Sequence, residues 1–308
     1  MTVPAPKRPL ADESGLKLVL ACCAGNINDL NATLRAVRTL PLVHLPPDQF
    51  LLQTAAKEGR AECTRFLFQH LRGCIARPDK RWDPYLPEGV TYRDIPDKWR
   101  IYENGVIHEA LSGKDPIGLF RVFLDFGIDP NISLDVAGSP LAQAVATNQL
   151  RLTEYLLSKG ADPNGYYMSN TLLGVAARLP DADVLRVLLL NGAQVAGSRA
   201  LQQAAQYWRI QSAEVLLEHG ASLDEVFTKV LYDDNMRPAE FPLGCALHFA
   251  IQSGKRDSCT ASQSGFIRYL IGRGAKTDLV DEKEETPLQM AQRLGKAEIV
   301  QIIESGKV

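Results

Sequence analysis

The chain has 308 residues, of which 45% are hydrophobic and 23% are charged, and its formal net charge is −2. This composition is ordinary for a soluble globular protein. Nonspecific binding to nucleic acid needs a basic surface, so the near-neutral charge argues against a direct DNA or RNA partner. No apolar run approaches the roughly 20 residues of a membrane span, so no membrane partner is expected.

The first part of the chain is expected to be a disordered lead over residues 1–13. The apolar run 16–24 resembles the core of a signal peptide, but Lys17 interrupts it and Asp12 and Glu13 precede it in place of basic residues. We therefore predict that this run forms a first helix. Six cysteines match no zinc pattern and no regular disulfide framework, which favours a reduced protein in the cytoplasm or nucleus: Cys22, Cys23, Cys63, Cys74, Cys245 and Cys259.

The segment at 139–164, SPLAQAVATNQLRLTEYLLSKGADPN, predicts two short helices joined by a tight turn. Pro140 suits the first position of a helix, where its missing N–H costs nothing. Asn148 ends that helix because Asn tolerates a left-handed backbone, and Gly160 caps the second helix. The apolar stripe of the second helix is predicted to be Leu152, Tyr155, Leu156 and Leu157.

The same sequence pattern recurs, with weaker similarity, at 171–195, 199–224 and 245–278. Self-similarity at a period near 30 residues indicates stacked helical units rather than one globular core. The glycine that ends each unit marks the period at Gly127, Gly160, Gly192, Gly220 and Gly274. Eight units are predicted, beginning near residues 14, 48, 104, 137, 169, 198, 243 and 284.

Two segments carry a resemblance to a known family: CALHFAIQSG at 245–254 and TPLQMAQRLGKAEIVQII at 286–303. In the first, Leu247, His248 and Ala250 occupy the Leu, His and Ala places of T-P-L-H-x-A, so the chain resembles the ankyrin repeats. The resemblance implies an all-α, ankyrin-type helix-turn-helix solenoid over residues 14–308. It also implies that His108 and His248, at the histidine position of the repeat, support the backbone rather than bind a ligand.

The sequence departs from the family pattern at several turns. Pro180 and Trp208 stand where a glycine closes the first helix of a unit. Val37 and Leu71 stand where a glycine caps the second helix. Longer or irregular turns are expected at these positions.

Three insertions interrupt the repeats. The first, 73–104, carries four prolines and five large aromatics, which either pack back onto the repeats or form an ordered flap beside a binding groove. The second, 225–243, is expected to form a finger between units six and seven. The third, 252–265, is rich in serine and is expected to be a flexible loop, with candidate phosphorylation sites at Ser258, Thr260, Ser262 and Ser264.

No catalytic pattern is present in the sequence. A Gly-rich phosphate loop, a G-x-S-x-G elbow, a kinase signature and the second histidine of a zinc-protease helix are all missing. The chain is therefore expected not to be an enzyme, and no cofactor or metal is expected.

The resemblance places binding on the turns between units and on the exposed face of the first helices. Tyr166–Tyr167, Arg178 and Tyr207–Trp208 come from consecutive units and are expected to converge, although Trp208 could equally fill a gap between units. Further candidates on the turns and helix faces are Asp129, Asn131, Asp162, Asn164, Asp224, Glu109, Gln143 and Gln252. The predicted partner-binding residues are Trp82, Tyr85, Tyr92, Trp99, Tyr102, Tyr166, Tyr167, Arg178, Gln203, Gln206, Tyr207 and Trp208.

Three functions follow from these patterns. The first is a monomeric scaffold or adaptor that binds another protein through the groove and the aromatic insertion. The second is a transcriptional coregulator that holds a transcription factor. The third is a small-molecule binder or enzyme in which the insertion closes over the groove.

Overall fold

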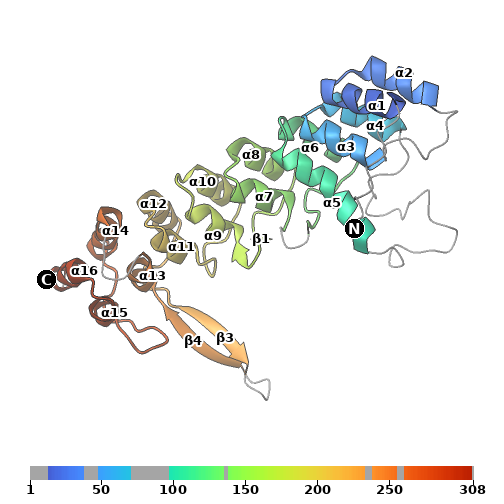
Figure 1. Cartoon of the computed structure of the whole chain (residues 1–308). Coiled ribbons are helices and arrows are strands. Elements are labelled where there is room, and N and C mark those ends of the chain that lie inside the picture. The colour runs from blue at the N-terminus through green and yellow to red at the C-terminus, as the bar shows by residue number, and fades with distance from the viewer. Residues whose placement is uncertain are drawn as a thin grey trace, which may run out of the picture. The chain divides into compact units, whose positions relative to one another are not determined.

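The computed structural model describes residues 13–37, 48–70, 97–134, 138–232, 238–254 and 260–306. The chain divides into an N-terminal unit, Met1–Leu134, and a C-terminal unit, Asp135–Val308. Within the described residues, the N-terminal unit contains three helix pairs and the C-terminal unit five (Figure 1). The predicted helical repeat and its eight units are therefore confirmed.

Several predicted features fall outside the described residues. These are residues 1–12 of the expected lead, the cap position Leu71, the phosphorylation candidate Ser258, and Trp82, Tyr85 and Tyr92 of the aromatic insertion. The last residue of the expected lead, Glu13, begins a helix. Trp99 and Tyr102 belong to a described helix, but their side chains are not described.

The N-terminal unit stacks its first helices against one another and its second helices beside them. Phe120 and Phe123 fill its core, with their ring centroids 5.4 Å apart. At the surface, Arg65 bonds Asp125 at 2.6 Å and joins two second helices. The helices are α1 (Glu13–Ala24), α2 (Ile27–Val37), α3 (Asp48–Lys57), α4 (Ala61–His70), α5 (Asp97–Ser112) and α6 (Pro116–Asp125).

The C-terminal unit has the same organisation. Its first helices pack in sequence and form the first-helix layer, and the second helices form a separate layer (Figure 1). The first helices are α7 (Pro140–Ala146), α9 (Leu172–Ala177), α11 (Ala200–Gln206), α13 (Ala246–Gln252) and α15 (Pro287–Arg293). The second helices are α8 (Leu150–Ser158), α10 (Asp183–Leu190), α12 (Ile210–Glu218), α14 (Ala261–Gly272) and α16 (Ala297–Ser305).

The unit built from 139–164 has the predicted chemistry at each position. Pro140 begins α7, and the Ser139 hydroxyl accepts a hydrogen bond from the Ala142 N–H. Asn148 has a φ of 56° and Gly160 a φ of 89°, so both helices end in left-handed residues as expected. Leu152, Leu156 and Leu157 are buried, which confirms that the leucines of the stripe face the core, whereas Tyr155 is half-buried.

The turns at Trp208 and Pro180 differ from each other. Trp208 has a φ of 54° and closes a three-residue turn between α11 and α12, so the turn is not longer than the one at Asn148, but its backbone conformation is unusual for a bulky residue. Its indole Nε1 donates to the Ala250 carbonyl at 3.1 Å, and this bond holds a bulky residue in a backbone conformation that usually needs glycine. At Pro180 the turn is longer, because residues 178–182 separate α9 from α10, and the prediction is confirmed.

Two antiparallel hairpins extend from the ends of the first helices (Figure 1). The shorter consists of β1 (Tyr166–Tyr167) and β2 (Asn170–Thr171). The longer consists of β3 (Phe227–Tyr232) and β4 (Pro238–Gly244), with a register shift between Phe227 and Thr228. The finger expected at 225–243 is therefore a β-hairpin, which the all-α prediction did not include.

The serine-rich segment also differs from its prediction. Helix α14 begins at Ala261, so residues 261–265 are helical rather than part of a loop. The reason is a cap: the Thr260 hydroxyl accepts from the Gln263 N–H. The Gln263 side chain then donates to the Ala250 carbonyl at 2.7 Å, and Ser264 is buried, which removes it as a phosphorylation site.

The C-terminal end of α13 joins three consecutive units. Trp208 and Gln263 both donate to the Ala250 carbonyl, and the buried Lys296 ammonium donates to the carbonyls of Ile251 at 2.7 Å and Ser253 at 2.9 Å. A helix C-terminus attracts positive charge, so the Lys296 position is favourable. These bonds hold units six, seven and eight together where the serine-rich segment lengthens the turn.

Candidate functional site

The predicted binding residues of the C-terminal unit lie in two groups. Tyr166 and Tyr167 precede α9, whereas Arg178 follows it. Helix α9 has six residues and is about 9 Å long, so the two groups lie at opposite ends of the first-helix layer. Gln206, Tyr207 and Trp208 end α11 and belong with Arg178. The single patch expected from the sequence is therefore divided in two.

The hairpin β1–β2 presents large side chains to solvent. Tyr166 is 61% exposed and Met168 is 67% exposed, while Tyr167 is half-buried. The hairpin packs on α7 and α9, and the Tyr166 carbonyl passes so close to Gly138 that a Cβ there has no room. The backbone that carries the exposed residues is thus anchored to the repeats. Sequence reasoning found Tyr166 and missed Met168.

Gln203, another predicted contact, is only 6% exposed. It belongs to α11, which packs against α9 on one side and α13 on the other, so its side chain is covered. Gln206 and Tyr207 remain exposed at the end of the same helix. The first-helix layer therefore offers its surface mainly at the helix ends in this unit.

Two of the turn residues proposed as contacts, Asn164 and Asp224, hold consecutive units together. Asn164 donates to the Gly192 carbonyl and accepts from the Gln194 N–H at 2.9 Å. Asp162 accepts from the Asn164 N–H, as expected for an Asx turn. Asp224 accepts from the Lys276 N–H at 2.9 Å. These side chains therefore build the turns, although Asp162 and Asn164 also remain exposed.

A hollow of about 160 Å³ lies beside α13 and α15 on the first-helix layer. Its lining combines apolar and charged side chains: Leu243, Phe249, Gln252, Asp281, Glu282, Lys283, Met290 and Arg293. Arg293 Nε bonds both carboxylate oxygens of Glu285, at 2.7 and 2.8 Å. Sequence reasoning had proposed Gln252 alone, although Phe249 and Met290 occupy one equivalent position in their units.

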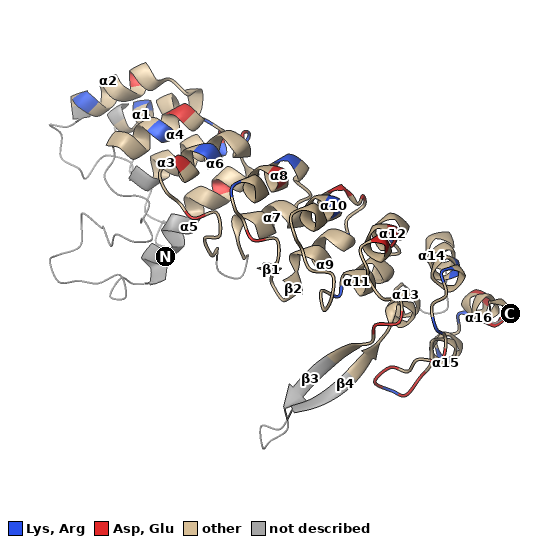
Figure 2. Cartoon of the chain, turned by 180° about the vertical axis from the view of Figure 1, so that it is seen from behind, with Lys and Arg blue, Asp and Glu red and all other residues tan. Residues whose placement is uncertain are grey.

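Acidic residues are concentrated in the loop that leads into α15 (Figure 2). The Asp281 carboxylate is buried and accepts from the N–H groups of Lys283 and Glu285, so it fixes the loop conformation. The rim of the hollow therefore has a defined backbone. The acidic residues of the loop are Asp278, Asp281, Glu282, Glu284 and Glu285.

Arg199 joins the base of the longer hairpin to the first-helix layer. It has a φ of 59°, and its guanidinium carbon lies 3.9 Å from the Phe227 ring centroid and 5.8 Å from that of Phe249. Burial lowers the pKa of Arg199. Stacking on two aromatic rings offsets part of the cost of desolvating the cation.

His248 has the backbone-supporting role implied by the resemblance. Its Nδ1 accepts from the Cys245 N–H at 3.2 Å, and its Nε2 lies 3.0 Å from the Glu285 carbonyl of the next unit. Burial lowers the pKa of His248, which favours the neutral ring that these two bonds require. His108, at the equivalent position of α5, is exposed.

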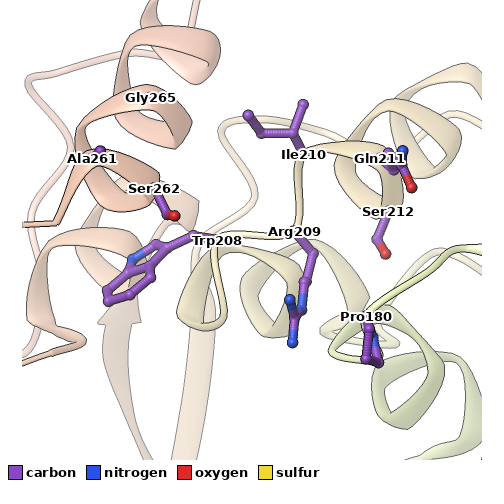
Figure 3. A pocket seen from close by; sticks show the side chains of 9 residues that line it. All are labelled: Pro180, Trp208, Arg209, Ile210, Gln211, Ser212, Ala261, Ser262 and Gly265. Carbon is purple, nitrogen blue, oxygen red and sulfur yellow. The ribbon is translucent and has the colours of Figure 1, made fainter.

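A cleft of about 260 Å³ lies where α12 and α14 begin (Figure 3). Trp208 forms one wall, and its indole lies against Gly254, where an added Cβ would be 3.3 Å from the ring. Trp208 therefore both fills space between units and borders an open cleft. The other lining residues are Pro180, Arg209, Ile210, Gln211, Ser212, Ala261, Ser262 and Gly265.

Two further features concern chemistry and membranes. Across the described ranges, no group of three or more His, Cys, Asp or Glu is placed to hold a metal. Burial raises the pKa of Cys22 to about 12, so its thiol is a poor nucleophile.

Among the helices that the structure describes, none is long and apolar enough to cross a membrane.

The comparisons with known proteins concern the fold. No protein-family model and no curated protein matches the chain. An ankyrin repeat domain from Acinetobacter baumannii AYE is similar, with a TM-score of 0.52 and 22% identity over 65% of this chain and 96% of that chain. The human ASB11 ankyrin repeat domain is also similar, with a TM-score of 0.52 and 20% identity over 66% of this chain and 83% of that chain.

Proposed function

Since the chain has the ankyrin-repeat fold, we propose that it is a non-enzymatic scaffold that binds a partner protein. Ankyrin repeats generally mediate binding between proteins, which supports this class of function. The proposed surface consists of the hairpin β1–β2, the exposed ends of the first-helix layer and the hollow beside α13 and α15. We call it the groove surface.

The observation that carries the proposal is the exposure of Tyr166 and Met168 on an anchored hairpin. Tyr and Met are enriched at protein interfaces. Because the hairpin is already packed on α7 and α9, binding there orders little additional backbone, and less of the contact energy is lost to entropy. Exposed large side chains on fixed backbone are typical of binding anchors.

The hollow supports the same function. Phe249 and Met290 supply an apolar floor, and the loop before α15 supplies a charged rim. Pockets for small molecules usually measure about 300–1,000 Å³. The hollow is smaller, and its size suits one side chain of a bound protein.

The proposal also includes a second contact region on this chain and an alternative class of partner. The aromatic insertion 73–104, with Trp82, Tyr85 and Trp99, is a second contact region. A transcription factor bound in the nucleus is the alternative partner class. Identification of the bound protein and its compartment separates a coregulator from a cytoplasmic adaptor.

The test is affinity purification of the intact tagged chain from its own cells, followed by quantitative mass spectrometry. Tyr166→Ala combined with Met168→Ala should reduce the recovery of a stoichiometric partner by roughly tenfold, as expected when anchor side chains are truncated. The matched control is Leu190→Ala, because Leu190 is an 81% exposed apolar residue on the second-helix layer. Equal recovery by all three chains would refute the proposed surface.

Protein stability must be measured on the same samples. Because Tyr166 and Met168 are mostly exposed, the double variant should keep the melting temperature of the original chain. A large fall in melting temperature would assign these residues to the packing of the hairpin. Partner loss would then no longer support direct contact.

A further inference from the structure

The cleft between α12 and α14 borders the end of the first-helix layer at Trp208, but it shares no lining residue with the hairpin β1–β2 or with the hollow beside α13 and α15. It is formed where the two second helices begin, rather than on the exposed side of the first-helix layer (Figure 3). Ile210, Gln211 and Ser212 come from the start of α12, and Ala261, Ser262 and Gly265 come from the start of α14. A ligand in this cleft therefore need not touch Tyr166 or Met168.

The walls of the cleft suit an apolar side chain. Trp208, Ile210 and Pro180 provide apolar surface on three sides. The wall from α14 is lined by small residues, and an added Cβ at Gly265 would meet no atom within 4 Å. At about 260 Å³, the cleft is below the usual size of a small-molecule pocket and can accept one large side chain.

The charge of the cleft is positive. Arg209 is the ionisable residue among those that line it, and its Nε donates to the Arg178 carbonyl at 3.1 Å. That acceptor is uncharged, and the ion pairs among the described residues do not include Arg209. Asp181, which follows Pro180, is not among the residues that line the cleft, and it accepts from the Asn148 amide and the Asp183 N–H. The residues that line the cleft therefore include one cation and no carboxylate.

We propose that this cleft is a second docking site, which receives an apolar side chain from an acidic segment of a partner protein. The apolar residue contacts Trp208 and Ile210, and a neighbouring Asp or Glu pairs with Arg209. Charge complementarity of this kind selects acidic over basic segments. The site goes beyond the proposed function because it lies between two second helices, apart from the hairpin β1–β2 and the hollow, and because it specifies an acidic partner segment.

The probe is a phage-displayed library of short random peptides, selected on the intact immobilised chain. The enriched sequences should share an apolar residue beside Asp or Glu. Gly265→Leu should weaken their binding by roughly tenfold or more, because the new side chain occupies the cleft. The control is Gly272→Leu, which adds the same side chain to open space at the far end of α14 and should leave affinity unchanged.

The charge is tested separately by affinity measurements on a synthetic peptide of the enriched sequence. Arg209→Gln should weaken binding and reduce its dependence on salt, whereas Arg209→Lys should retain most of the salt dependence. Tyr166→Ala with Met168→Ala should bind as tightly as the original chain. That result would separate this site from the proposed function, since each can fail alone.

Four outcomes would overturn the docking site. They are enrichment of basic sequences, equal binding by the Gly265→Leu and Gly272→Leu chains, no enrichment at all, or concentration-dependent self-association that Gly265→Leu abolishes. The last would show that a second copy of the chain occupies the cleft. Melting curves of every variant establish that each chain is folded before its binding is compared.

Discussion

Substitution of His248 by glutamine tests the energetics of the connection between units seven and eight. The imidazole makes two bonds to the backbone: Nδ1 accepts from the Cys245 N–H, and Nε2 donates to the Glu285 carbonyl. Its Nδ1 also lies 3.3 Å from the Cys245 Sγ. Gln289 occupies the equivalent place in unit eight, and its Oε1 accepts from the Thr286 N–H at 2.8 Å. Glutamine at 248 should therefore keep the backbone cap on α13 and lose the bond to Glu285.

The size of the effect follows from what remains bonded. The Glu285 carbonyl also accepts from the Asp281 N–H at 3.1 Å, so it is not left without a partner. His248→Gln should then cost about 0.5–1.5 kcal/mol, the net value of one hydrogen bond. His248→Ala also removes the acceptor for the buried Cys245 N–H, and should cost about 2–4 kcal/mol.

The pH dependence gives the sharper test. Burial lowers the pKa of His248 in the folded chain below its unfolded value of about 6.5. The unfolded chain therefore binds the proton more readily, so the contribution of His248 is complete above about pH 6.5 and is lost as the pH falls through the folded value. Glutamine does not titrate, so the stability advantage of the original chain should shrink on acidification.

The assay is urea denaturation followed by circular dichroism, on the original chain and on His248→Gln, from about pH 8 to about pH 5. Other ionisable groups are common to both chains and cancel in the difference between their free energies of unfolding. A difference that stays constant over this range would refute the assignment of a buried, neutral His248. An advantage that grows on acidification would contradict the sign of the shift.

Two further substitutions test the packing. Leu156→Asp should bury an unpaired charge in α8, destabilise the chain by several kcal/mol and reduce its helical circular dichroism, whereas Leu190→Asp, at an 81% exposed site, should change stability by less than about 0.5 kcal/mol. Trp208→Gly should be less destabilising than Trp208→Ala by about 1 kcal/mol, because only glycine adopts the positive φ without strain. Thermal melting that ranks alanine above glycine would refute strain at Trp208.

The parts of the fold that sequence could predict are those fixed within one unit. A proline at the start of α7, left-handed residues at Asn148 and Gly160 and the apolar spacing of α8 all act through neighbouring backbone. Because that pattern recurs along the sequence, it also predicted a stack of helix pairs. Local signals for the two missed elements were also present: alternating β-formers in 227–232, and a Thr260–Gln263 spacing typical of a capping box.

The candidate site was less predictable because its geometry depends on contacts between units. Sequence identified Tyr166 and Tyr207 as aromatic residues of consecutive units, but not that they occupy opposite ends of the first-helix layer. Gln203 resembles Gln206 in sequence, and only the packing of α11 between α9 and α13 separates a buried side chain from an exposed one. The hollow at Phe249 and Met290 could not be predicted from the sequence, because it depends on where the loop before α15 lies.

Trp208 shows how a departure from the repeat can be stabilised by distant residues. A glycine would close the turn without strain, so the indole must contribute enough to offset the cost of a positive φ. Its bond to Ala250 spans 42 residues in sequence and meets the bonds from Gln263 and Lys296 at the end of α13. The turn between α13 and α14, residues 253–260, begins at this point. Trp208, Gln263 and Lys296, from three consecutive units, therefore hold together a turn that a short glycine turn closes in other units. Their bonds leave the cleft beside α12 open.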